Sequence, residues 1–300
     1  MLHNDKDNFE QVILKVSSET GIEPAIIEKD YYVTLFLKRL VELQPNIIFK
    51  GGTSLSKCYK IINRFSEDID LNIETMNKPT EGQRKKLKEN IVSIIDEFGF
   101  VLENIENVKS RRNYNKYIID YPTVFPSSYL KEHLLVETLV DIKAFPCERL
   151  QATSIIYDYL NDNGYYDLIA QYSLEPFELN VQVATRTFID KLYALGDYYL
   201  DDTVQEHSRH IYDLYKLSDI VSLNADLKQL VSEVFEERKP IERCRSAKDG
   251  VDMHALLQEI IDKDVYKKDY EELTSKMLFE EVPYSTAIKT LQKIVDYKLF

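Results

Sequence analysis

The stretch 46–73 constrains this chain more than any other part of its sequence. It opens with a short apolar run whose length and β-branched residues are typical of a buried strand. A glycine pair, Gly51-Gly52, follows, and it stands out because the chain holds only eight glycines. Apolar residues then recur at helical spacing over 53–63, and polar and apolar residues alternate over 68–73. The sequence therefore predicts a strand, a tight turn, a helix and a second strand with one polar face.

The turn has the residues of a phosphate site. Gly51 and Gly52 let the backbone approach a phosphate closely, and the free amides at the start of a helix favour negative charge. Thr53 and Ser54 add two hydroxyl donors. The G-x-x-x-x-G-K-[ST] spacing of a Walker A loop is absent. Taken alone, these four residues favour an ordinary turn between a strand and a helix over a phosphate site.

Two aspartates, Asp68 and Asp70, lie on the second strand. Residues two positions apart on a strand point to the same face, and two adjacent carboxylates repel each other unless a cation lies between them. Oxygen ligands select Mg²⁺ or Mn²⁺. The alternative is a solvated outer face on an edge strand. A phosphate site beside a metal site of two carboxylates predicts nucleotidyl transfer from an NTP.

Such a metal site usually includes a third carboxylate from a neighbouring strand. Glu137 is the first candidate because it interrupts an apolar run over 134–140, where an acid is costly to bury without a cation. Asp141 has the same strand parity and is the second candidate, and Asp120 is the third. The sequence leaves the choice among them open.

The rest of the chain predicts a mixed α+β first half and an all-helical second half. Helical spacing or capping marks further helices at 6–18, 24–43 and 80–98. Strands are expected at 101–108, 116–123 and 132–142. From about residue 148 onward helical spacing recurs, at 149–162, 183–200, 207–220, 224–237, 251–262 and 284–298. We expect the change of character between residues 145 and 180.

The net charge of the chain limits its nonspecific binding to other molecules. It holds 38 basic and 51 acidic residues, a net charge of −13, so it is a poor general binder of nucleic acid. A narrow basic patch remains compatible with that balance, and the loop with Arg111 and Arg112 is a candidate whose role stays open. The acidic excess also suits a basic protein partner.

The cysteines and the apolar runs indicate a cytoplasmic protein. Cys58, Cys147 and Cys244 form neither a disulfide framework nor a zinc motif, and they fit a reducing compartment. Residues 1–10 are polar and charged, unlike a signal peptide. Every apolar run is far shorter than the ~20 residues of a membrane helix. We therefore expect the protein in the cytoplasm.

Several of these segments resemble one known family. Residues 49–57 and 64–71 look like the AbiEii/AbiGii nucleotidyltransferase toxins of type IV toxin–antitoxin and abortive-infection systems. Residues 188–195 resemble the lysine-containing helix of that family, and 209–215 resemble a later segment of it. His210 departs from the family pattern, in which an aspartate is more usual. The resemblance spans roughly residues 25 to 220.

The resemblance implies a fold and an activity. The fold is a DNA polymerase β-like nucleotidyltransferase core, a mixed sheet with helices, followed by an α-helical C-terminal lobe. We expect the core at 1–150 and the lobe, which completes the active site, at 151–300. The implied activity is transfer of a nucleotide from an NTP with Mg²⁺ or Mn²⁺, in several members onto the 3′ end of tRNA. A cognate antitoxin would neutralise the protein, which we expect to be a monomer.

The resemblance also implies roles for individual residues. Gly51, Gly52, Thr53 and Ser54 would hold the triphosphate, and Asp68, Asp70 and Glu137 would bind metal. Lys191 would contact the nucleotide phosphates, so the expected catalytic residues are Asp68, Asp70, Lys191 and Asp213. Asp213 would act as a base or orient Lys191. Without the resemblance, Lys191 would be taken for an exposed lysine and Asp213 for a partner of Arg209 at helical spacing.

Two other functions remain compatible with the sequence. The same chemistry could transfer the nucleotide to a protein side chain, as in AMP transfer. A protein that binds an NTP without turnover could instead regulate a partner, although a pure binder has no need of the Asp68 and Asp70 pair.

Overall fold

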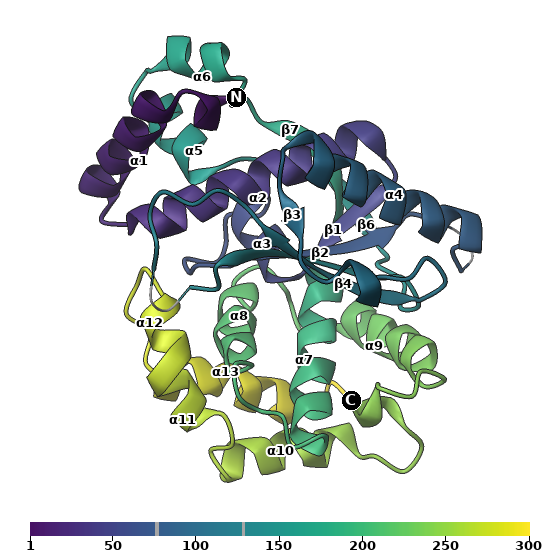
Figure 1. The fold of residues 1–300 in the computed structure, drawn as a ribbon. Coiled ribbons are helices and arrows are strands. Elements are labelled where there is room, and N and C mark those ends of the chain that lie inside the picture. The colour runs from purple at the N-terminus through teal and green to yellow at the C-terminus, as the bar shows by residue number, and fades with distance from the viewer. Residues whose placement is uncertain (76–77, 128–129) are drawn as a thin grey trace. The chain divides into compact units, whose positions relative to one another are not determined.

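The computed structural model describes residues 1–75, 78–127 and 130–300, which form two compact units (Figure 1). The first unit comprises residues 1–59 and 66–181, and the second comprises 60–65 and 182–300. Within the described ranges, no helix is both long enough and apolar enough to cross a membrane.

The first unit is built on one mixed sheet. Among the described residues its strand order is β3-β4-β5-β2-β1-β7-β6. The strand β2 pairs antiparallel with β1 and parallel with β5, while β4 pairs antiparallel with β5. The strands are β1 (Ile47–Lys50), β2 (Asp68–Ile73), β3 (Val101–Leu102), β4 (Tyr114–Asp120), β5 (His133–Leu139), β6 (Cys147–Ala152) and β7 (Phe177–Gln182).

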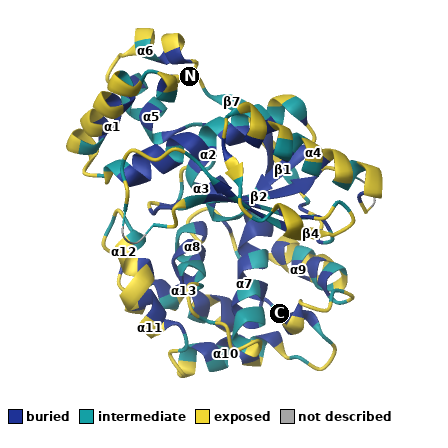
Figure 2. Cartoon of the chain, in the orientation of Figure 1, coloured by how far each residue is buried: buried dark blue, intermediate teal, exposed yellow. Residues whose placement is uncertain are grey.

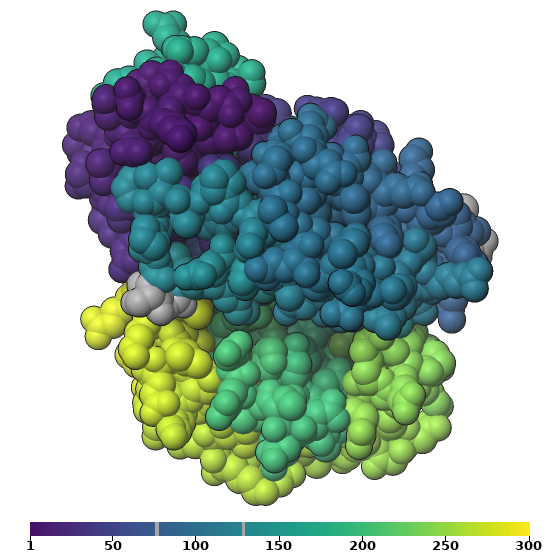
Figure 3. Space-filling model, in the orientation of Figure 1, coloured from purple at the N-terminus to yellow at the C-terminus, as the bar shows by residue number. Residues whose placement is uncertain are grey.

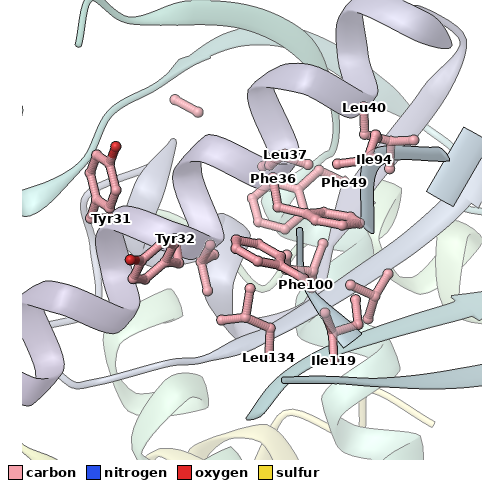
Figure 4. Close-up of a cluster of buried hydrophobic side chains, with 14 of the residues drawn as sticks. Tyr31, Tyr32, Phe36, Leu37, Leu40, Phe49, Ile94, Phe100, Ile119 and Leu134 are labelled. Carbon is pink, nitrogen blue, oxygen red and sulfur yellow. The ribbon is translucent and has the colours of Figure 1, made fainter. Parts of the chain in front are cut away.

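Two long helices, α2 and α4, cover one face of this sheet. Pro24 occupies the first turn of α2, where its missing amide has no partner to lose, and Thr80 with Gln83 forms a capping box on α4. Figure 4 shows side chains of α2 packed with Ile94 of α4 and with strand residues such as Phe49 and Leu134. The helices of this unit are α1 (Lys6–Thr20), α2 (Pro24–Leu43), α3 (Gly51–Lys57), α4 (Glu81–Glu97), α5 (Ile155–Asp162) and α6 (Tyr166–Tyr172).

The helices of the first unit differ in how deeply they are buried. In Figure 2, α2 is largely buried, whereas α1 and α4 turn an exposed face to solvent. The N-terminal residues pack beside α6, as the neighbouring purple and teal surfaces of Figure 3 show. There the amide of Asn8 donates to the Tyr172 hydroxyl (2.9 Å), which itself donates to Asp5 (2.7 Å). Helix α2 is central to the unit, since it carries many buried residues and packs against α4, α5 and β5.

The second unit is helical. Its helix α7 packs against α8, α9 and α10, and α8 also packs against α13. Segment 60–65 joins this unit through backbone hydrogen bonds, among them Phe65 N–H to the Met277 carbonyl (2.9 Å). The helices are α7 (Ala184–Leu200), α8 (Arg209–Leu217), α9 (Ala225–Arg238), α10 (Met253–Asp262), α11 (Lys267–Asp269), α12 (Ser275–Met277) and α13 (Tyr284–Asp296), with a π-helical turn at Tyr270–Thr274.

The mixed α+β class and most of the long helices are confirmed, and three expectations are wrong. The strand expected at 101–108 is only Val101–Leu102, followed by a short 3₁₀ turn. The helix expected over 53–63 ends at Lys57. The second half is not all-helical, because β6 occupies the start of the helix expected at 149–162 and β7 follows at Phe177–Gln182. Both strands belong to the sheet, and the division between the units falls after Val181.

Candidate active site

The aspartates Asp68 and Asp70 lie on one face of β2, near the N-terminal end of the strand. Between and beyond them, Ile69 and Leu71 are fully buried in the core under α2 and α4. Since successive strand residues point to opposite faces, the two carboxylates share the other face and stay partly exposed. The alternation in the sequence therefore correctly placed both acids together and away from the core.

The sheet register places Glu137 beside Asp70. Strands β2 and β5 run parallel, and in their register Asp70 is paired with Glu137. On the other side of β5, Lys116 of β4 is the register partner of Glu137, and its ammonium lies 3.4 Å from the Glu137 carboxylate. A third carboxylate is thus next to the aspartate pair, on the neighbouring strand.

The other two candidates for the third carboxylate lie elsewhere in the first unit. Asp120 ends β4 opposite His133, and the two side chains are 3.2 Å apart. His133 is four residues from Glu137 along β5, a separation of about 13 Å at the rise of a strand. Asp141 lies beyond the end of β5 at Leu139.

Gly51 allows the turn to approach Asp70. Its φ of +75° is a conformation that residues with a side chain rarely adopt. A Cβ atom on Gly51 would lie 2.0 Å from the carboxylate oxygen Oδ2 of Asp70. The glycine therefore serves two needs, a left-handed backbone and room for an aspartate of the candidate site.

We expect Gly51→Ala to impair this site strongly. The left-handed backbone costs a residue with a Cβ about 1–2 kcal/mol, and the alanine methyl group must in addition displace the Asp70 carboxylate. Thermal unfolding should show the backbone cost, and nucleotide transfer should fall further than that cost explains. Gly99→Ala is the matched control, because Gly99 also has positive φ (+67°) but has no atom within 4 Å of an added Cβ. Equal losses of activity in the two variants would contradict the expectation.

The hydroxyl groups of Thr53 and Ser54, in the first turn of α3, are both hydrogen-bonded. Thr53 donates to the backbone carbonyl of Asp68 (2.5 Å) and lies 2.9 Å from the Ser66 hydroxyl. Ser54 donates to the Gly51 carbonyl (2.8 Å), and both side chains are buried. In this structure the hydroxyls hold the turn and tie it to Asp68. The groups best suited to a phosphate are the first amides of α3, which have no partner within the helix.

The carboxylates are ligands of the type that a hard divalent cation takes. Asp68, Asp70 and Glu137 supply only oxygen ligands, and they come from the same face of two adjacent strands. Mg²⁺ and Mn²⁺ prefer such ligands. The missing side chain of Gly51 leaves room for the Asp70 carboxylate, whose Oδ2 atom an added Cβ would meet at 2.0 Å. The residues present therefore fit a metal of this class.

The second unit contains a buried cluster around Asp213. The guanidinium of Arg64 contacts both carboxylate oxygens of Asp213, at 2.7 and 2.8 Å. The ammonium of Lys191, on α7, donates to the same carboxylate at 2.5 Å. Asp213 is fully buried and Lys191 nearly so, so Lys191 is not the exposed lysine that its helical position alone suggests.

This cluster carries one more positive charge than negative. Burial alone would raise the pKa of the Asp213 carboxyl, but Arg64 and Lys191 together lower it, so the carboxylate is ionised at neutral pH. Burial lowers the pKa of the Lys191 ammonium, and the Asp213 carboxylate opposes that effect. Two cations therefore share one anion, an arrangement that favours binding of a further anion such as a phosphate.

His210 borders the same cluster. Its Nδ1 atom lies 3.5 Å from the Lys191 ammonium. Burial and the charges of Lys191 and Arg209 lower the pKa of His210 well below its ordinary value. The imidazole is therefore neutral at pH 7 and presents Nδ1 as an acceptor to Lys191, leaving the net charge of the cluster unchanged.

Sequence reasoning missed Arg64 as a member of this cluster. The residue lies in the stretch that carries the family resemblance, but only its burial and its two contacts with Asp213 assign it a role.

The arginines of the basic loop at residues 111 and 112 make local contacts in the first unit. The Arg111 side chain is 84% exposed and forms a surface ion pair with Glu81, while Arg112 donates to the Asn107 carbonyl.

Comparison with known proteins identifies the family of the chain. A family model described as the nucleotidyl transferase AbiEii toxin of type IV toxin–antitoxin systems matches residues 35–296. The nucleotidyltransferase toxin MenT4 from Mycobacterium tuberculosis H37Rv has a similar fold, with a TM-score of 0.50 and 16% identity over 95% of this chain and 88% of that chain. No curated protein matches the sequence. The family match covers most of the chain, which therefore belongs to the AbiEii family of nucleotidyltransferase toxins of type IV toxin–antitoxin systems.

Proposed function

We propose that this toxin transfers a nucleotide from an NTP to the 3′ acceptor end of tRNA, with Mg²⁺ or Mn²⁺ as cofactor. The observation that carries the proposal is the set of three carboxylates, Asp68, Asp70 and Glu137, on one face of β2 and β5. Of the three candidates for the third carboxylate, Glu137 is the one in register with Asp70.

The carboxylates and the turn would bind the reactants. Asp68, Asp70 and Glu137 would hold the divalent cation, which when bound favours ionisation of the attacking hydroxyl and neutralises charge on the phosphates. The backbone of Gly51 to Ser54 would bind the triphosphate. The tRNA 3′ hydroxyl would lose its proton to solvent as its oxygen forms the new bond to the α-phosphorus, while the bond from the α-phosphorus to the bridging oxygen of the β-phosphate breaks and pyrophosphate leaves.

Lys191 would neutralise charge on the phosphates of the NTP, and Asp213 would hold it in place. Because Arg64 and Lys191 keep Asp213 ionised and occupy both of its oxygens, the carboxylate suits the role of an orienting group better than that of a base. The surplus positive charge of the cluster is the physical support for this assignment. A fixed cation contributes most where charge develops in a site protected from water.

The tRNA acceptor and the antitoxin are proposed from the family resemblance and from the net charge of the chain. Transfer to tRNA follows from the resemblance to family members that modify the 3′ end of tRNA. A net charge of −13 makes general binding to RNA unfavourable, so the acceptor would be recognised through a narrow contact. The same acidic surface suits a basic antitoxin. We propose that the toxin acts as a monomer in the cytoplasm until that antitoxin binds it.

Labelled nucleotides test the proposal. Purified protein is incubated with each of the four NTPs, labelled in turn at the α- and the γ-phosphate, together with tRNA. We expect the α-label and not the γ-label to enter tRNA, because nucleotidyl transfer keeps the α-phosphate and releases the γ-phosphate as part of pyrophosphate. Transfer should disappear when the tRNA 3′ end has been oxidised with periodate.

Each alternative has its own outcome in the same experiment. Label that migrates with protein instead of tRNA would favour a protein side chain as the acceptor. NTP binding without release of pyrophosphate, with every acceptor supplied, would favour a regulatory binding protein. Transfer of the γ-label would show phosphoryl transfer and contradict the proposed chemistry.

A further inference from the structure

Helix α2 carries three consecutive charged residues, Glu28, Lys29 and Asp30, in the interior of the first unit. Glu28 and Lys29 are 0% and 1% exposed. Charges are costly to remove from water, and a buried one persists only with partners of good geometry. Each of the three has such partners, and they lie on segments far away in the sequence.

Lys29 reaches the segment that leads into β2. Its ammonium forms an ion pair with the Glu67 carboxylate and donates to the Lys131 carbonyl at 2.5 Å. Glu67 directly precedes Asp68 in the chain. Burial lowers the pKa of Lys29, while the carboxylates of Glu67 and Asp68 act in the opposite direction. The negative charge of Asp68 therefore raises the pKa of the Lys29 ammonium, as the charge of its direct partner Glu67 does.

The residue on each side of Glu67 is held as well. Thr53 contacts the Ser66 hydroxyl and donates to the backbone carbonyl of Asp68. Three consecutive residues, 66–68, are thus fixed by side chains from α2 and from the turn after β1. The backbone at Asp68 is therefore held by Thr53 of α3, and the residue before it is held by Lys29 of α2.

The neighbours of Lys29 on α2 hold other parts of the same unit. Asp30 accepts from the Lys57 ammonium at 2.5 Å, at the end of α3, and from the Ile155 amide at 2.8 Å. Glu28 accepts from the backbone amides of Val124 and Phe125 in the connection between β4 and β5. Helix α2 therefore supports several segments of the unit, and its Lys29 contacts the residue that directly precedes Asp68.

We propose that the buried Lys29–Glu67 ion pair is a positioning element that sets the Asp68 carboxylate for metal binding. The inference rests on the proposed function, since it takes Asp68 as a metal ligand. A buried ion pair adds little to stability, because desolvation offsets the attraction, but it restricts geometry. Groups that orient a metal ligand typically change metal affinity by 10–100-fold when they are removed.

The test measures the affinity of the full chain for Mn²⁺ by electron paramagnetic resonance. No nucleotide is added, so the result does not depend on catalytic activity. The double variant Lys29→Met/Glu67→Met replaces the ion pair by apolar side chains of similar length. We expect Mn²⁺ to bind about tenfold more weakly or worse, with an unchanged or higher melting temperature. Glu67→Gln, which keeps the size of the side chain and a hydrogen-bond acceptor, should show a smaller loss and serves if the double variant does not fold.

Two further variants separate the possible outcomes. Lys15→Met/Glu19→Met removes an exposed ion pair on α1, in which each side chain is 52% exposed, and should bind Mn²⁺ like the wild type. Asp68→Asn removes a proposed ligand, so the Mn²⁺ binding that this variant loses is the binding at the proposed site. Wild-type affinity in both Glu67 variants, with Asp68→Asn impaired, would overturn the positioning role and leave the proposed function standing. Unchanged binding in Asp68→Asn would overturn both.

Discussion

Replacing Asp68 by asparagine is expected to reduce nucleotidyl transfer by a factor of about 10³ or more. The amide keeps the size of the side chain but removes a negative charge from a face where Asp70 and Glu137 already lie side by side. A hard cation binds carboxylate far better than a neutral amide. Charge stabilisation by such a metal amounts to several kcal/mol, and each 1.36 kcal/mol is a factor of ten in rate. Asp68 is partly exposed, so the variant should remain folded.

Transfer of α-label to tRNA under single-turnover conditions measures this effect. Asp70→Asn and Glu137→Gln should also lose activity, whereas Asp120→Asn and Asp141→Asn should retain it, because neither residue lies in register with Asp70. Asp120→Asn is the sharpest control, since it removes a carboxylate from the same sheet. Activity of Asp68→Asn within tenfold of the wild type would contradict the proposed site. Loss in Asp120→Asn with retention in Glu137→Gln would reassign the third carboxylate.

The local part of this site could be predicted from the sequence. The shared face of Asp68 and Asp70 follows from the two-residue period of a strand, and the turn follows from the glycine pair. Both are properties of short segments. The register that sets Glu137 beside Asp70 joins residues far apart in the chain, and only tertiary pairing decides it. The sequence could single out Glu137 as an acid within an apolar run, although its side chain is partly exposed in the structure, but could not choose it over Asp141.

The errors in the fold have a similar origin. The strand β6 lies at the edge of the sheet and is mostly exposed, so its few apolar residues merge with those of α5 into an apparent helical period. The strand β7 is buried over four consecutive residues, 179–182, and a run buried on both faces shows no alternation. The helix after the glycine pair ends at Lys57, and the chain then passes into segment 60–65, which belongs to the second unit.

The least predictable residues are charges that the fold buries. Lys29 and Arg64 belong to residue types that are mostly exposed, and neither has a sequence neighbour that reveals its partner. Their roles come from contacts with Glu67 and Asp213, which lie 38 and 149 positions away in the chain. A row of three charges between apolar residues, as at 28–30, was the one available indication that a helix carries charge into the core.

Asparagine at position 213 is expected to destabilise the protein by about 3–5 kcal/mol, the usual range for a buried ion pair that loses one partner. Asp213 is fully buried and is the carboxylate shared by Arg64 and Lys191. Without it, two buried cations face each other with no anion between them. Lys191→Met instead removes one of the two cations. It leaves the two hydrogen bonds between Arg64 and the Asp213 carboxylate in place. We expect that variant to lose transfer activity with little loss of stability, as urea unfolding should show.

The double variant distinguishes charge from packing. If Asp213→Asn is unstable because Arg64 and Lys191 repel each other, then adding Lys191→Met removes one of the two charges and should recover part of the lost stability. If the single variant is unstable only because asparagine packs poorly, the second substitution can add only a further loss. Unfolding free energies of the wild type, both single variants and the double variant form a complete cycle. A double variant less stable than Asp213→Asn alone would show that repulsion between the two cations is not the main cause of the instability, and it would remove the electrostatic reason for assigning the phosphates of an NTP to this cluster.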